Sequence, residues 1–396
     1  MAVSVTKLEF WDAVGIIVHR CTLVQSEEVA ATKCIGRVLG EPAIASCDYP
    51  RADMAALDGF TLPHVDVVQG AQSFVLGAAI NTGAIGEPVV AGIANPISTG
   101  AGIPLGAGAV VARKHAVAHG TSLDLAKPVA ASLNIRSRGE DTRAGEKILG
   151  AGTLVGPAGL GALLSGGVQE VAVRRAIRIV IIPTGNELQS DGLACIADLS
   201  GPMIAASLAC QRYVVDRYQA EVDSEDAVAT AFDRAILAYN PDVIFTVGGA
   251  SGGSRDVVAA AARRLGADFH LSGVKMRPGK PVLFATLPDG RLFFGLPGNP
   301  VAALVACRFF VNAALRCMVG LPGETGTPVA CDTGESQPHT RVLAATLERE
   351  ADGRCRANIV PGQKSHRLRP LLDGSHWLVV GAGESRQGLV FPFEAR

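Results

Sequence analysis

Apolar and polar positions follow two different patterns in the first part of the chain. Between Leu8 and Val18, apolar residues recur at helical spacing, and we expect helical structure over residues 8–40 with interruptions at Gly36 and Gly40. From Cys47 to Leu133 the helical period is lost. Short apolar runs at 74–76, 88–90, 109–112 and 128–131 are separated by Gly, Pro, Asn and Asp, which is typical of a small β domain.

Strands and helices alternate over residues 176–318. The run Ile179–Pro183 is short and continuously apolar, as expected of a strand that is buried on both faces. Ser224 is a capping residue with acids in the turn that follows it, so it predicts the start of a helix. Further strands are expected at 213–215 and 242–247, and further helices at 201–209, 254–265 and 301–315. This alternation predicts a parallel α/β unit.

The changes of pattern divide the chain into four parts. The fold class is therefore multidomain, with α/β and β parts. We expect a mixed, partly helical N-terminal domain (1–48 plus 134–175), an inserted small β domain (49–133), a three-layer α/β domain (176–318) and a C-terminal β domain (319–396).

Composition and charge exclude several classes of protein. With 48% apolar residues in 396, the chain can bury real cores, and disorder is excluded as its main state. Lys and Arg (36) balance Asp and Glu (37), which argues against a general nucleic-acid or anionic-membrane binder. We expect no membrane span, because no apolar run reaches about 18 residues, and no signal peptide. Nine scattered cysteines without a CxxC pair favour a reduced, cytoplasmic protein.

Three glycine-containing loops follow predicted strands of the α/β unit. They are Pro183–Leu188, Gly248–Gly253 and Gly295–Pro300. Each alone could be only a turn, but ligands bind at the carboxyl ends of parallel strands, where loops of this kind meet. Three on one edge favour a phosphate or pyrophosphate site built from backbone amides. The spacing matches neither the nucleotide P-loop nor the dinucleotide fingerprint.

Charged side chains are expected at the same edge. Glu187, Asp223 and Asp256 lie near predicted strand ends and could hold Mg²⁺ beside a phosphate, although Asp223 is equally well explained as a helix cap. The segment Lys275–Lys280 carries three cations, which suit an anionic ligand but would also suit a solvated loop.

Two segments outside the α/β unit also concentrate charge. Residues 49–60 place acids, including Asp58, at the edge of the β domain. Residues 134–141 bring opposite charges close together, which could be a surface ion-pair cluster of little energetic value. Alternatively, Arg136 and Arg138 could receive an anion or orient Asp141.

Seven motifs in a fixed order resemble one protein family. They are Ala56–Phe60, Ser98–Ala101, Asn134–Asp141, Pro183–Leu188, Gly248–Asp256, Arg277–Pro281 and Leu296–Pro300. Any one is a weak signal. Together, and across almost the whole chain, they resemble the molybdopterin molybdotransferases, the family of MoeA and of the gephyrin E domain.

The resemblance implies a reaction and an assembly. In this family, adenylylated molybdopterin binds with Mg²⁺, and molybdate displaces AMP and becomes bound to the dithiolene. The α/β domain would be similar to MogA. A homodimer would form each active site between the α/β domain of one protomer and the β domain of the other. An adenylyltransferase and recipient molybdoenzymes would be partners, whereas nucleic acid and membrane would not.

The resemblance also assigns roles residue by residue. It implies catalytic roles for Asp58, Thr99, Asp141, Glu187 and Lys280. It implies that magnesium is bound by Glu187, Asp223 and Asp256. It implies that the molybdopterin substrate is bound by Thr184, Gly185, Gly248, Gly249, Ser251, Gly252, Arg277, Pro297, Gly298, Asn299, Pro300 and Ser365.

The chain departs from the family pattern at several positions. Asn95 stands where the family usually has Arg, and Gly273 where it often has Lys. Three family acids are replaced, by Gly108, Lys114 and Asn186. Two alternatives to insertion therefore stay open. One is a diverged paralogue that binds or carries molybdopterin, or that handles tungstate. The other is adenylyl transfer to molybdopterin.

Overall fold

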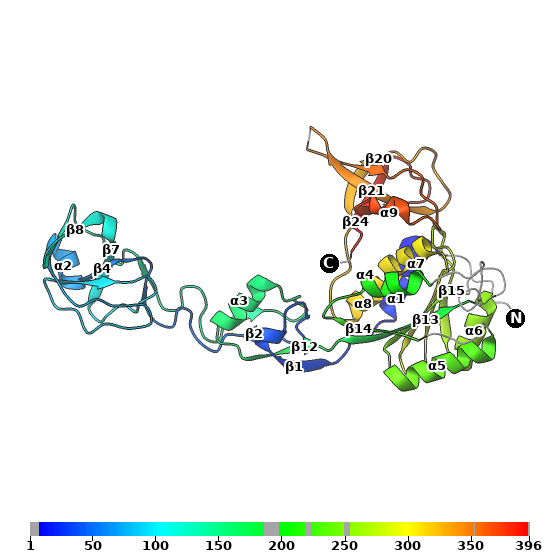
Figure 1. Cartoon of the computed structure of the whole chain (residues 1–396), viewed down its shortest axis with the longest axis horizontal. Coiled ribbons are helices and arrows are strands. Elements are labelled where there is room, and N and C mark those ends of the chain that lie inside the picture. The colour runs from blue at the N-terminus through cyan, green and yellow to red at the C-terminus, as the bar shows by residue number, and fades with distance from the viewer. Residues whose placement is uncertain (1–7, 186–197, 219–223, 249–253, 352, 395–396) are drawn as a thin grey trace. The chain divides into compact units, whose positions relative to one another are not determined.

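The computed structural model describes residues 8–185, 198–218, 224–248, 254–351 and 353–394, without the side chains of 254–256. It forms two compact units, coloured by residue number in Figure 1. The first unit contains residues 1–27, 36–40 and 173–396, and the second contains 28–35 and 41–172. The chain passes between them more than once, so neither unit is a single continuous segment.

A six-stranded sheet lies at the centre of the first unit. Its order is β14 (Tyr213–Arg217), β13 (Ile177–Thr184), β15 (Val243–Gly248), β19 (Leu292–Leu296), β18 (Leu283–Thr286) and β16 (Asp268–Ser272). The first four strands are parallel, as expected, whereas β18 runs in the opposite direction, and β16, antiparallel to β18, runs in the direction of the first four. The sheet is therefore mixed. A tight turn at Gly290 joins β18 to β19, and so short a connection cannot link parallel strands.

Helices cover both faces of this sheet (Figure 1). One face holds α5 (Glu225–Tyr239) and α6 (Ser254–Arg264). The other holds α1 (Phe10–His19), α4 (Ser200–Ser207) and one long helix made of α7 (Pro300–Ala306), the π-helical turn η4 (Cys307–Val311) and α8 (Asn312–Met318). Neighbouring residues of β13 point into opposite cores, Ile179 and Ile181 into one and Val180 and Ile182 into the other. The expected three-layer arrangement is confirmed.

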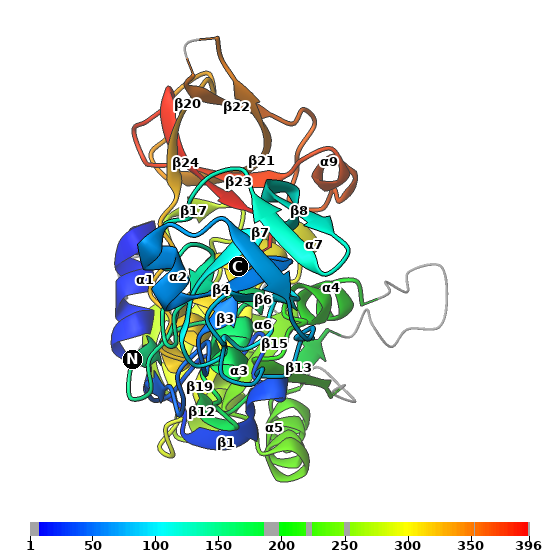
Figure 2. The same ribbon diagram turned by 90° about the vertical axis from the view of Figure 1, so that its left-hand side faces the viewer.

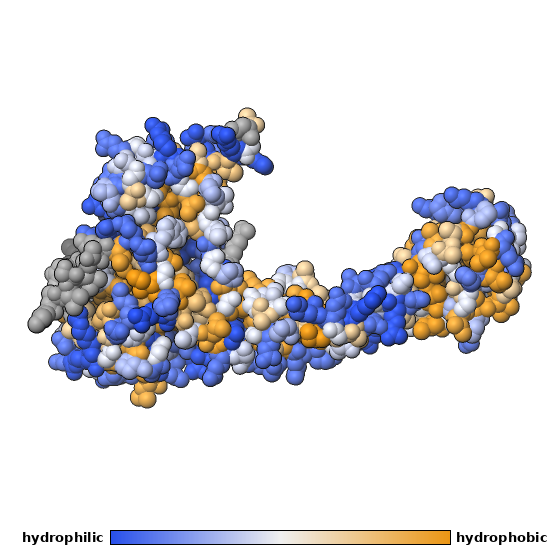
Figure 3. Space-filling view, turned by 180° about the vertical axis from the view of Figure 1, so that it is seen from behind, coloured by the Kyte–Doolittle hydropathy of each residue, from blue (hydrophilic) through white to orange (hydrophobic). Residues whose placement is uncertain are grey.

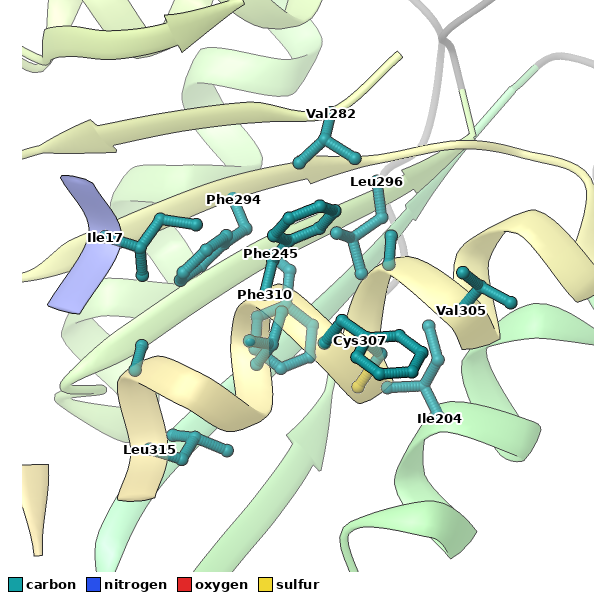
Figure 4. Close-up of a cluster of buried hydrophobic side chains, with 14 of the residues drawn as sticks. Ile17, Ile204, Phe245, Val282, Phe294, Leu296, Val305, Cys307, Phe310 and Leu315 are labelled. Atoms are coloured by element: carbon teal, nitrogen blue, oxygen red, sulfur yellow. The ribbon is translucent and has the colours of Figure 1, made fainter. Parts of the chain in front are cut away.

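The sequence predicts no apolar segment of the length that spans a membrane, but the long helix of the structure reaches that length. Residues Pro300–Met318 form a helix of 19 residues that is long and apolar enough to cross a membrane by length and composition, although 78% of it is buried inside the protein. Figure 4 shows its side chains Val305, Cys307, Phe310 and Leu315 packed below Phe245 and other core residues of the sheet. Burial of this kind explains the apolar character of the helix.

The N-terminal helix is shorter than predicted. It ends at His19, and residues Ser26–Ala30 form a strand, β1, rather than more helix. This strand pairs with β12 (Glu170–Arg174), and a short 3₁₀ turn follows at Ala31–Lys33. The expectation of helix over 8–40 was therefore wrong beyond the first ten-residue helix. The cause is the distant partner β12, which a local period does not reveal.

The C-terminal region forms a closed barrel. The sheet order is β17 (Met276–Arg277), β21 (Thr340–Arg349), β22 (Cys355–Ile359), β20 (Thr327–Cys331), β24 (Gln387–Pro392) and β23 (His376–Val380). Because β23 also pairs with β21, the last five strands close on themselves, and Figure 2 shows them as a ring. A short helix, α9 (Arg369–Leu372), accompanies them. Strand β17 joins this sheet from the preceding α/β segment by parallel pairing with β21.

The second unit is built around another six-stranded sheet. Its order is β7 (Ala107–Ala112), β4 (Gly59–Pro63), β6 (Ile93–Ile97), β5 (Ser73–Leu76), β9 (Ser122–Leu125) and β8 (Ala116–His119), with α2 at His64–Gln69 and a 3₁₀ turn at Arg113–His115. Two of the four apolar runs noted in the sequence are strands, while 88–90 and 128–131 are not. Figure 3 shows many apolar side chains on the surface of this part. Leu105 and Val68 are among its exposed large apolar residues.

The rest of the second unit consists of short pieces. Two small antiparallel ladders pair β2 (Ala43–Ile44) with β11 (Lys147–Leu149) and β3 (Met54–Ala55) with β10 (Ile135–Arg136). Helix α3 (Pro157–Ser165) follows them, with Pro157 at its first turn.

Candidate functional site

The ends of three parallel strands meet at very close range. Thr184, the last residue of β13, pairs with Gly248, the last residue of β15. Gly248 has a φ of +101°, and any Cβ at this position would collide with the carbonyl oxygen of Thr184. A Cβ on Gly298, in the turn after β19, would lie 3.2 Å from the Gly248 Cα. Glycine is required here because backbone takes the space that side chains would fill.

A buried hydroxyl lies in this cradle. Thr184 is only 2% exposed, and its Oγ1 has no hydrogen-bond partner in the part of the chain that the structure describes. Gly185 follows it with a φ of +139°. Buried hydroxyls normally find a partner, since leaving one unpaired costs free energy. The cradle of Thr184, Gly248 and Gly298 therefore offers a donor and close backbone access, which fit a phosphate group.

The loop Gly295–Pro300, which follows β19, makes polar contacts on both sides. The carbonyl of Gly298 accepts a hydrogen bond of 3.2 Å from the Ser200 hydroxyl. Asn299 donates from Nδ2 to the Ser365 hydroxyl at 3.4 Å, which brings two predicted binding residues together. Pro300 occupies the first turn of α7, so the loop ends where the long helix begins.

A basic cavity of about 710 Å³ lies between this loop and the C-terminal barrel. Pro297 and Asn299 line it, so the turn that touches the cradle also borders the cavity. Its charged and titratable lining side chains are all basic: Arg277, Lys280, His339, Arg341, Lys364 and His366. None of the described residues that line it is Asp or Glu. An enclosure of this composition attracts anions.

Arg341 carries the clearest sign of an incomplete site. Its guanidinium donates to the carbonyl oxygens of Thr333 and Glu384, each at 3.0 Å, and these acceptors carry no charge. Its Nε is buried and has no partner among the described residues. Sequence reasoning did not find Arg341 or His339, because they reach the cavity only through the pairing of the barrel with β17.

The pKa of His339 responds to this basic surrounding. Partial burial lowers it first, and the positive charges of Arg277, Arg341 and Lys280 lower it further. The imidazole is therefore neutral at neutral pH in the protein without ligand. Lys275, by contrast, does not line the cavity; its ammonium pairs with Glu9 at 2.7 Å.

The candidates of the second unit form a separate polar group. Thr99 donates to the Asp58 Oδ1 from its backbone N–H at 2.8 Å and from its hydroxyl at 2.9 Å. These two hydrogen bonds are the main cause of the lowered pKa of Asp58. Both residues are exposed, as is Asp141. The carboxylate at position 58 is therefore held charged and oriented.

The ion pairs of Arg136 and Arg138 favour a surface ion-pair cluster over an anion-binding role. Arg136 pairs with Glu140 at 2.6 Å, and Arg138 pairs with Asp48. Both arginines thus already have carboxylate partners, as in a surface ion-pair cluster. In the described part of the chain, the ion pairs of these arginines go to Glu140 and Asp48 and not to Asp141.

Several predicted residues lie outside the described part of the chain. These are Glu187, Asp223, Gly249, Ser251 and Gly252, and the side chain of Asp256. Among the residues that are described, no three His, Cys, Asp or Glu side chains come close enough together to hold a metal ion. The described residues thus give no magnesium site of their own.

Two of the replaced family positions have clear structural surroundings. Asn95 donates from Nδ2 to the carbonyl of Ala78 at 3.0 Å. Gly108 lies in β7 against α2, where a Cβ would come within 2.5 Å of the His64 Cα. The loss of the family acid at position 108 is therefore accompanied by backbone packing that excludes a larger side chain.

Comparison with known proteins follows the same division of the chain. Residues 8–167 match the MoeA N-terminal region (domain I and II), and residues 180–317 match a probable molybdopterin binding domain. A solved MoeA protein of molybdopterin biosynthesis from Pyrococcus horikoshii has the same fold, with a TM-score of 0.77, 22% identity, and coverage of 98% of this chain and 100% of that one.

Curated relatives extend over most of the chain. A molybdopterin molybdenumtransferase of Staphylococcus aureus is 30% identical over 366 residues, which are 88% of this chain and 85% of the relative. One from Synechococcus elongatus is 29% identical over 383 residues, with 93% and 94% coverage. The chain therefore belongs to the molybdopterin molybdenumtransferase family of molybdenum cofactor biosynthesis.

Proposed function

We propose that this protein inserts molybdate into adenylylated molybdopterin and releases AMP. One observation carries the proposal. The turn Pro297–Pro300 touches the phosphate cradle through Gly298 and borders the basic cavity, in which no described lining residue is Asp or Glu, through Pro297 and Asn299. A substrate with a phosphoanhydride and an oxyanion substrate can thus be held side by side.

The reaction needs little covalent chemistry from the protein. One oxide of molybdate leaves with the two thiol protons of the dithiolene as water, while the two sulfurs bind molybdenum. One water cleaves the phosphoanhydride and gives AMP, so the waters cancel and no oxidation state changes. The task of the protein is to bind and orient both substrates, which converts an encounter of two molecules into a reaction within one complex.

The described residues divide this task between them. The Thr184 hydroxyl and the backbone around Gly248 would hold phosphate oxygens. Arg277, Lys280 and Arg341 would hold the oxyanion by charge-assisted hydrogen bonds. The approach of two anions is unfavourable in the absence of such cations, since like charges repel.

Magnesium and the homodimer are proposed from the family resemblance. Mg²⁺ would be held by Glu187, Asp223 and Asp256 and would neutralise phosphoanhydride charge. Asp58, Thr99 and Asp141 would act from the β domain of a second protomer. An adenylyltransferase would supply the substrate and molybdoenzymes would receive the product in the cytoplasm.

A carrier role is the second candidate. The packing of Gly108 against His64 favours it, because the family acid cannot return to this position without displacing backbone. A carrier, or a paralogue that handles tungstate, would bind molybdopterin tightly without releasing AMP on addition of molybdate.

The test is AMP release from adenylylated molybdopterin with Mg²⁺, with and without molybdate. We expect molybdate-triggered release, and a loss of about 10- to 100-fold in Lys280→Met, since a charge-assisted hydrogen bond contributes about 1.5–3 kcal/mol. Lys275→Met is the matched control, because that lysine pairs with Glu9 outside the cavity, and it should retain activity. Tight binding without release would instead establish the carrier.

A further inference from the structure

Four fixed positive charges line the basic cavity. Arg277 and Arg341 occupy paired positions on the neighbouring strands β17 and β21. Lys280 and Lys364 add two more fixed charges, and no acid is found among the described lining residues. Like charges repel one another, so an anion that enters the cavity lowers its electrostatic free energy.

Two histidines from different segments also line the cavity. His339 lies directly before β21, and His366 lies in the segment that follows β22. The charged groups that act on His339 are Arg277 from β17, Lys280 from the turn after it and Arg341 from β21. Lys364 and His366, from the segment after β22, are the other basic groups that line the cavity. The three cations oppose a positive charge on the imidazole as long as the cavity holds no anion.

We propose that the cavity binds a tetrahedral dianion together with one proton, and that His339 takes up this proton. The inference rests on the proposed function and adds a proton-linked binding residue to it. The bound dianion adds an attractive charge beside the ring and offsets part of the neighbouring positive charge, so it shifts the equilibrium toward the imidazolium. The protonated ring then supplies a charge-assisted N–H donor to the anion. The proton comes from solvent, and the only bond formed is N–H.

Proton linkage fixes the sign of the pH dependence. The group is neutral in the protein without ligand and protonated in the complex, so lowering the pH strengthens binding. Affinity should rise by up to about tenfold for each pH unit while the free imidazole is still neutral and the bound one is charged. Fixed cations alone would give an affinity that is nearly independent of pH in this range.

The dianion has two chemically equivalent sources in the proposed reaction. It is either free molybdate or the phosphate monoester of AMP. We would therefore measure binding of each to the full chain by calorimetry, in two buffers of different ionisation enthalpy, between pH 6.5 and pH 8. Sulfate, which remains a dianion throughout, shows that the proton is taken up by the protein and not by molybdate.

The expected result is an uptake that approaches one proton per bound anion and disappears in His339→Gln. That variant should still bind through the fixed cations, but with a flat pH profile. His339→Asn serves as a second variant if the first is poorly folded by circular dichroism. His119→Gln, an exposed histidine of the second unit, is the control and should take up the proton as the wild type does.

Either of two results would overturn the inference. One is a binding heat that does not depend on the buffer for any of the three anions. The other is an unchanged proton uptake in both His339 variants. Uptake with molybdate or with AMP supports it and identifies the source. Failure of molybdate to trigger AMP release in the wild type would refute the proposed function separately, because anion binding is measured without the turnover assay.

Discussion

Removal of the Thr184 hydroxyl should separate stability from activity. The group is buried, and its Oγ1 has no partner in the described part of the chain. An unpaired buried hydroxyl costs about 1–3 kcal/mol. Thr184→Val keeps the shape and removes the cost, so the melting temperature should rise by about 2–10 °C. The same change removes a donor to a charged phosphate, so AMP release should fall by about 10- to 100-fold.

Thr246 provides a matched control within the same sheet. It lies in β15, two residues before Gly248, is fully buried, and also has an Oγ1 without a partner among the described residues. Thr246→Val should therefore gain stability while retaining activity. Calorimetric melting and chromatographic detection of AMP measure both properties. Wild-type AMP release in Thr184→Val, or an equal loss in both variants, would refute the assignment of the Thr184 hydroxyl to the phosphate site.

Two further predictions concern stability. Gly108→Ala should destabilise the protein by about 1–3 kcal/mol, because the added Cβ would lie 2.5 Å from the His64 Cα. Gly150→Ala has open space and should be nearly neutral; equal melting temperatures would show that the β7–α2 packing adapts. Glu324→Ala should cost about 3–5 kcal/mol, because it leaves the buried charge of Arg308 without its partner at 2.5 Å. A loss below about 1 kcal/mol in urea unfolding would mean that water reaches this guanidinium.

The sequence predicted those features of the fold that depend on neighbouring residues in the chain or on general rules for parallel sheets. The apolar run at Ile179–Pro183 became the buried strand β13 because a strand covered on both faces has no polar alternation. The Ser224 hydroxyl accepts a hydrogen bond from the Ala227 N–H at the start of α5, as its residue type predicted. The meeting of Thr184 and Gly248 followed from the rule that parallel strands end at one edge.

The features that the sequence did not reveal depend on distant partners. Strand β1 has mostly exposed residues and no apolar alternation, and it exists because β12 pairs with it. Strands β18 and β16 complete the sheet through two antiparallel pairings, which the α/β alternation does not predict. The basic cavity needs side chains from segments some sixty residues or more apart, such as Arg277 and Arg341, and only the folded barrel brings them together.

The pairing of β17 with β21 limits how this architecture can be exchanged between proteins. Strand β17 precedes the long helix in the chain, yet it pairs with the first two residues of β21 in the barrel. A chimaera joined after Met318 would supply a foreign barrel whose β21 lacks its own β17. The backbone groups at the start of that β21 would then have to pair with a β17 from a different protein. Recombination that preserves the structure must therefore transfer Met276 and Arg277 together with the barrel, so the unit of inheritance is discontinuous in sequence.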